Sequence, residues 1–224
     1  MNWIKRYRSI PERKKIIVYG KLTFLKNLFY FAFKMSVAFY YKSWFLVAIA
    51  IYGLFIGYVK NNCSRGLSKN KESINEINTY IRGGVVLSFS SIFYITYSVF
   101  QMFMVPHFNY NMIIAIAIAA FATYGITMSI VGVVHTKGKT MLIKEYKLTN
   151  FATAFNNLVL AQIGLLSFSD IANAGVYNGL LGVICGMVVL IVGIYLSIDG
   201  ALKKRKYNQL IKKYPDFFKY TPEN

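Results

Sequence analysis

Residues 22–59 read LTFLKNLFYFAFKMSVAFYYKSWFLVAIAIYGLFIGYV, and the number of times that this apolar stretch crosses a membrane sets the orientation of the rest of the chain. The stretch is long enough for two helices, with a break near Lys42. We therefore predict two spans, over about residues 22–41 and 43–59. A helical hairpin that does not cross the membrane is the alternative.

The composition indicates a membrane protein. Its 224 residues are 56% apolar and 15% charged, which is too apolar for a soluble domain of this length. Lys and Arg number 26 against 8 Asp and Glu, for a formal net charge of +18. The basic residues lie between long apolar blocks, where they meet lipid headgroups, so we interpret the charge as a determinant of topology. We predict the lipid bilayer as a partner and no nucleic acid.

Four further apolar blocks follow, at about residues 84–105, 111–134, 150–168 and 175–199. A helix rises about 1.5 Å per residue and the hydrocarbon core is about 30 Å thick, so each block has roughly the length of a span. Residues 1–21 are a basic segment suited to the membrane interface, and residues 200–224 are a basic cytoplasmic tail. The sequence thus predicts an all-α integral membrane protein with a single transmembrane domain over residues 22–199.

The positive-inside rule orients these spans, because short cytoplasmic loops are enriched in Lys and Arg. With six spans and both termini in the cytoplasm, the inside segments carry seven, five, four and seven basic residues, and only Lys42 lies outside. We predict this multi-pass arrangement in the plasma membrane. Four spans preceded by a non-crossing N-terminal helical hairpin also satisfy the rule, and that alternative stays open.

Glycines follow one side of the last predicted helix. At 100° per residue, a set of six falls within about 60° of arc. We call this set the glycine ridge, and it consists of Gly175, Gly179, Gly182, Gly186, Gly193 and Gly200. Small residues let helix backbones approach closely, which drives helix association in lipid. We expect the ridge to pack against another helix of the chain, a second copy of the chain or another membrane protein.

Lys34 is the most unusual charge within the predicted spans. It lies in the outer half of the first helix, and helical spacing places Asn27 and Tyr41 on its side. Its side chain leans toward the cytoplasmic end of the helix, so we expect it to point into the bundle. We predict a site for an anionic or protonatable solute at Lys34. A lysine satisfied by carbonyl groups and water is the alternative.

Uncharged polar residues gather on two other predicted helices. Ser91 and Gln101 share one side of the third helix, and Asn156 and Asn157 lie on the fifth. Polar groups inside a membrane either line a path for a solute or form hydrogen bonds between helices. The pattern alone leaves both interpretations open.

No catalytic or metal-binding motif accompanies these features. The chain has no Gly-rich phosphate loop and no C-x-x-C, and its two histidines, His107 and His135, fall on opposite predicted sides of the membrane. We therefore expect no enzyme activity, no metal and no cofactor.

The leading functional hypothesis is a small transport-type protein for a small solute or ion. Its path would run between the first, third and fifth helices and would use Lys34, Asn27, Tyr41, Asn156, Asn157, Ser91 and Gln101. The alternative is a non-transporting accessory or assembly subunit, which would bind another membrane protein through its glycine ridge or form a homo-oligomer.

Two resemblances add to this interpretation. The run NLFYFAFKMSVAFYYKSWFLVAIAIYG, residues 27–53, resembles the opening hairpin of a group of uncharacterised multi-span membrane proteins from low-GC Gram-positive bacteria, which implies a topology and no activity. The spacing of Asn27, Lys34 and Ser43 is similar to the first helix of cation diffusion facilitators, which are six-span metal exporters. Their second and fifth helices carry Asp and His ligands, whereas residues 43–59 and 151–168 contain neither, so metal transport is disfavoured.

Overall fold

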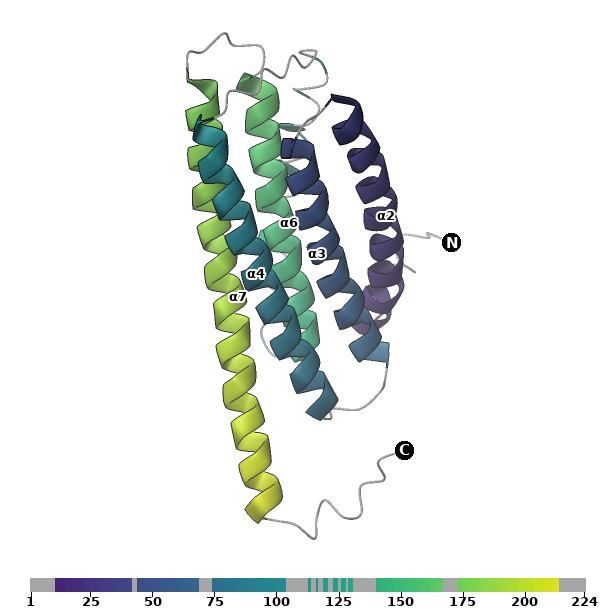
Figure 1. Ribbon diagram of the computed structural model, residues 1–224. Coiled ribbons are helices and arrows are strands. Elements are labelled where there is room, and N and C mark those ends of the chain that lie inside the picture. Colours follow the sequence, from purple (N-terminus) through teal and green to yellow (C-terminus); the bar gives the residue numbers. More distant parts are fainter. Residues whose placement is uncertain are drawn as a thin grey trace, which may run out of the picture.

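The computed structural model of the protein consists of long helices packed side by side (Figure 1). The structure describes residues 11–41, 44–68, 74–103, 140–166 and 173–213, and isolated positions between 113 and 130. Some side chains within these ranges, most of them on the first helix, lie outside the description. All described residues are helical except Pro11, Thr140 and Asn173. The predicted all-α class is confirmed for this part of the chain.

The helices with defined bounds are α2 (Glu12–Tyr41), α3 (Trp44–Ser68), α4 (Ile74–Phe103), α6 (Met141–Leu166) and α7 (Ala174–Lys213). α7 begins after Asn173, whose φ of 73° lies in the left-handed region that Asn tolerates better than most residues. The carbonyl of Asn173 accepts hydrogen bonds from the backbone N–H groups of Val176 and Tyr177. With 40 residues, α7 is roughly 60 Å long and extends beyond the other helices at one end (Figure 1).

The most extensive contact in the bundle joins α4 and α7. Next in extent is the contact of α2 with α3, and α3 in turn contacts both α4 and α6 (Figure 1). Among the described residues α2 does not contact α4 and touches α6 only slightly. The second, third and fifth of the predicted helices therefore meet, rather than the first, third and fifth.

The glycine ridge of α7 is covered by α4. Ser98 lies against Gly179 and Gly182, and Gly200 meets Ile81. At the closest approach the two backbones touch: a Cβ on Gly193 would lie 2.7 Å from the backbone nitrogen of Ser88. The small residues thus serve packing within the chain, as is usual where helices approach closely in lipid.

The outer surface of the bundle is apolar. Phe29 on α2 is 72% exposed, Phe103 on α4 is 83% exposed and Ile191 on α7 is 66% exposed, and each is one of many exposed large apolar side chains on its helix. Soluble proteins rarely expose so many large apolar side chains on their helices. Within the described residues, α4 and α7 are long and apolar enough to cross a membrane, and only 39% and 33% of their most apolar windows are buried. Such exposure distinguishes them from the core helices of a soluble protein.

The prediction of six spans is not supported by these helices, because only α4 and α7 of the described part meet the length and hydropathy of a crossing helix. Lys21, Lys26 and Lys34 interrupt the apolar part of α2, and four amide side chains lower the hydropathy of α6. The apolar part of α3, residues 44–59, is shorter than the about 20 residues that a crossing helix needs. The predicted fourth span, residues 111–134, lies largely outside the described residues.

Candidate functional site

A carboxylate is enclosed where α3, α4 and α6 meet. Glu145, in the second turn of α6, has no exposed surface. Neither of its carboxylate oxygens accepts a hydrogen bond from an N–H or O–H group of the described residues. Its polar neighbour is the thiol of Cys63 on α3, which is also wholly buried and is a weak hydrogen-bond donor. An acidic side chain in such surroundings is rare, since buried charges in proteins are normally paired.

Gly83 on α4 makes room for this carboxylate. A Cβ at Gly83 would overlap the Oε1 atom of Glu145, and the same position lies 3.4 Å from Cγ1 of Val59 on α3. The Glu145 carboxylate therefore rests directly on the backbone of α4, with α3 on its other side. Any side chain larger than hydrogen at position 83 would displace Glu145 or separate α4 from α6.

Lys60 extends the polar interior along the α3–α6 interface. This lysine is only 5% exposed, and its Nζ atom donates a 2.9 Å hydrogen bond to Oγ1 of Thr153 on α6. Thr153 donates to the backbone oxygen of Thr149, and Thr149 donates to that of Glu145. These polar residues recur at a spacing of four and so share one face of α6. We call this set the Glu145 cluster: Lys60, Cys63, Glu145, Thr149 and Thr153.

Burial governs the protonation of Glu145 and Cys63, the two acidic groups in the cluster. Both lie outside the predicted spans: Cys63 follows the second, and Glu145 precedes the fifth. Desolvation raises the pKa of the Glu145 carboxyl well above its ordinary value, and the Cys63 thiol opposes this by a smaller amount. Desolvation also raises the pKa of the Cys63 thiol, the negative charge of Glu145 raises it further, and the positive charge of Lys60 lowers it. The thiol thus keeps its proton and faces the carboxyl as a donor.

A second group of polar side chains joins α4 to α7 beside the Glu145 cluster. The hydroxyl of Tyr80 donates a 3.0 Å hydrogen bond to Oδ2 of Asp199, and Lys203 forms a 2.8 Å ion pair with the same oxygen. Lys144 bonds to the hydroxyl of Tyr195, so the neighbour of Glu145 in sequence is directed toward α7. These contacts hold α4, α6 and α7 together at the end of the bundle where α4 and α6 begin.

The structure places the residues of the predicted path at different interfaces. Lys34, Asn27 and Tyr41 belong to α2, and their side chains lie outside the described part of the structure. Asn156 is 7% exposed, with an Oδ1 atom that has no hydrogen-bond partner, whereas Asn157 is half-buried.

The two path residues predicted on α4 are both buried. Ser91 donates a 2.7 Å hydrogen bond to the carbonyl of Leu87 in its own helix. The Nε2 atom of Gln101 has no hydrogen-bond partner among the described residues. Ser91 is therefore satisfied within α4, while Gln101 is one of several buried polar groups that are not.

Unpartnered buried polar atoms occur along most of the bundle, in the part of the chain that the structure describes. On α4 they are the hydroxyl of Tyr94 and the Nε2 atom of Gln101, and the Glu145 carboxylate of α6 lies at the level of Gly83, 18 residues before Gln101. Eighteen residues of helix correspond to about 27 Å, which approaches the hydrocarbon thickness of about 30 Å. Asn178 on α7 adds a further such atom toward the Gln101 end.

Sequence reasoning missed Glu145, Lys60 and Cys63. It placed Glu145 in a basic loop because the predicted fifth span began at residue 150, whereas α6 begins at Met141. The signal that could have found the site is the series Glu145, Thr149 and Thr153, which repeats every four residues without interruption.

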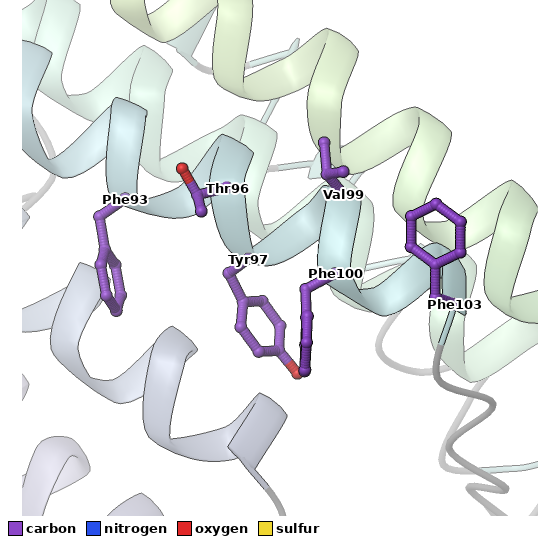
Figure 2. Close-up of a pocket in the computed structure, with 6 residues that line it drawn as sticks. All are labelled: Phe93, Thr96, Tyr97, Val99, Phe100 and Phe103. Carbon is purple, nitrogen blue, oxygen red and sulfur yellow. The ribbon is translucent and has the colours of Figure 1, made fainter.

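A hollow on the side of α4 is a weaker candidate. It has a volume of about 420 Å³ and is lined by Phe93, Thr96, Tyr97, Val99, Phe100 and Phe103 (Figure 2). The hydroxyl of Thr96 is bonded to its own helix, at the carbonyl of Ile92. With its mainly aromatic lining, this hollow fits an apolar surface in contact with lipid rather than a polar solute.

Among the described residues no three His, Cys, Asp or Glu side chains gather at a spacing suited to a metal ion. The chain matches no protein-family model, no curated protein and no solved structure. The Glu145 cluster is therefore the candidate functional site of the described residues.

Proposed function

We propose that the chain is a multi-pass protein of the bacterial plasma membrane, with both termini in the cytoplasm, and that it is a transport-type protein for a small solute or ion. The path runs along the interface of α3, α4 and α6. The observation that carries the proposal is Glu145, an ionisable side chain that is fully buried without an N–H or O–H donor among the described residues. An ionisable side chain that is buried without a partner is a candidate for a functional site.

The surroundings of Glu145 support a path over a purely structural role. A structural acid would be expected to form an ion pair, as Asp199 does with Lys203 at 2.8 Å. Two buried polar atoms without partners, the Tyr94 hydroxyl and Nε2 of Gln101, lie on α4 within about 27 Å of helix from the level of Glu145. Such atoms gain hydrogen bonds when a polar solute or water passes.

The alternative of an accessory subunit that binds a partner through the glycine ridge requires that ridge to be accessible. Gly179, Gly182 and Gly193 are buried against α4. α4 already covers these glycines, so their packing does not favour an accessory subunit that binds a partner through the glycine ridge.

Flux through reconstituted protein tests the proposal. Liposomes containing the full chain and a pH-sensitive dye would be given a potassium diffusion potential with valinomycin, with and without a sodium gradient. We expect proton flux above that of protein-free liposomes, and we expect Glu145→Gln to abolish the excess while Glu76→Gln, at the start of α4, retains it. Wild-type flux equal to that of empty liposomes under every gradient would overturn the proposal in this form.

A further inference from the structure

The Glu145 carboxylate is closely packed between α4 and α3. On one side the carboxylate occupies the place of the missing Gly83 side chain, and on another it faces Val59 and Cys63. A metal cation needs several ligands at once, and among the described residues no third His, Cys, Asp or Glu joins Glu145 and Cys63. A proton needs one acceptor and no volume.

The groups that face this carboxyl come from each helix packed on it. α3 contributes the Cys63 thiol, with the Lys60 ammonium beside that thiol, and α4 contributes the Tyr80 phenol. On α7 the carboxylate of Asp199 is engaged by Tyr80 and Lys203. No described cation pairs with Glu145, so its ionised form would be an uncompensated buried charge while these helices stay together.

We propose that Glu145 is a proton-binding site whose occupancy closes the interface of α3, α4 and α6, and whose deprotonation opens it. This proposal rests on the proposed transport function and names the coupling species as the proton. In the closed state the neutral carboxyl packs against Gly83. Loss of the proton breaks only the O–H bond of the carboxyl, and the proton passes to water that enters as α6 moves away from α4.

The driving force for opening is the solvation of the charge. An ionised carboxylate in an apolar interior is much more costly than a neutral one, whereas in water it is well solvated. Burial raises the pKa of Glu145, so the closed and protonated state persists above the pH at which an exposed carboxyl ionises. Gly83 makes the coupling direct, because the carboxyl contacts the α4 backbone with no intervening side chain.

Infrared spectroscopy of the full chain in lipid nanodiscs tests the protonation. At neutral pH we expect a carbonyl stretching band of a protonated carboxylic acid, which Glu145→Gln removes and Glu76→Gln retains. Glutamate labelled with ¹³C should shift this band in the wild-type protein, so the test holds even if Glu145→Gln does not fold. Absence of the band from the wild type, or its persistence in folded Glu145→Gln, would overturn the proposal.

The two cysteines of the chain report the opening without engineering. Cys63 lies beside Glu145, and Cys185 is buried on α7 and serves as an internal control for the general rise in thiol reactivity with pH. We expect labelling of Cys63 by a permeant maleimide to rise several-fold more than that of Cys185 between mildly acidic and alkaline pH. This excess should vanish in Glu145→Gln. A constant ratio in the wild type would refute the opening.

The two experiments separate this proposal from the proposed function. An acid band and pH-dependent labelling without any proton flux would leave the proton-binding site standing and remove transport. Flux without the acid band would retain transport and remove Glu145 as the proton-binding site.

Discussion

Gly84 on α4 offers the sharpest test of how the bundle is held together. A Cβ at this position would lie 2.7 Å from both the backbone nitrogen and the Oγ atom of Ser197 on α7, and 2.9 Å from the carbonyl oxygen of Gly193. Two of these three atoms belong to the backbone of a helix and cannot rotate away. Gly84→Ala must therefore push α4 and α7 apart along their extensive contact.

The magnitude follows from two opposing effects. Overpacking a close contact typically costs about 1–3 kcal/mol, while alanine is more favourable than glycine inside a helix by about 0.5–1 kcal/mol. Because backbone atoms block the new methyl group, the cost lies at the upper end of its range. We expect a net loss of about 2 kcal/mol, which corresponds to a fall in melting temperature of about 4–8 °C for a chain of this size.

Thermal unfolding in detergent, followed by circular dichroism of the helices, measures this loss. Gly53→Ala on α3 is the matched control, since no atom lies within 4 Å of a Cβ at that position. The control should leave the melting temperature unchanged or raise it slightly. A Gly84→Ala protein as stable as the wild type, or an equal loss in Gly53→Ala, would refute the close-packing argument.

Four further changes test other parts of the molecule. Because burial raises the pKa of Glu145 above its ordinary 4.5, the folded state retains a proton that the unfolded chain releases, so the melting temperature of the wild type should fall as the pH rises above that value. Glu145→Gln should flatten this dependence, and an equally steep fall in the variant would contradict the assignment. Tyr80→Phe removes the hydroxyl that donates to Asp199, and since Lys203 still pairs with Asp199 the expected loss of stability is only about 1 kcal/mol; an unchanged melting temperature would mean that this bond contributes nothing. A reporter fused after Tyr41 should lie outside the cell if residues 22–59 cross twice, and a cytoplasmic signal there would exclude the six-span topology. Because the proposed path excludes α2, Lys34→Met should leave the proton flux of reconstituted protein unchanged, and a large fall in the flux of the folded variant would place Lys34 on the path.

The helical class and the apolar exterior were predictable from the sequence. Both depend on local properties. Long apolar blocks form helices because the backbone must satisfy its own hydrogen bonds in lipid, and the apolar composition alone indicates that lipid surrounds these helices. The glycine ridge was predictable for the same reason, since helical periodicity places residues 175, 179, 182 and 186 on one side whatever lies opposite. The number of membrane crossings was harder to predict from the sequence. Lysines within α2 and amides within α6 lower the hydropathy of these helices, although both helices pack in the bundle.

Local sequence therefore specifies which faces of each helix are apolar, small or polar. The packing of the helices, in contrast, places α4 over the ridge and brings α3, rather than α2, against α4 and α6. The same holds for Glu145, which is polar in sequence and flanked by lysines, yet buried because Gly83 and Cys63, both distant along the chain, close over it. Burial and pairing depend on neighbours from other helices, and a local pattern carries no information about which neighbours those are.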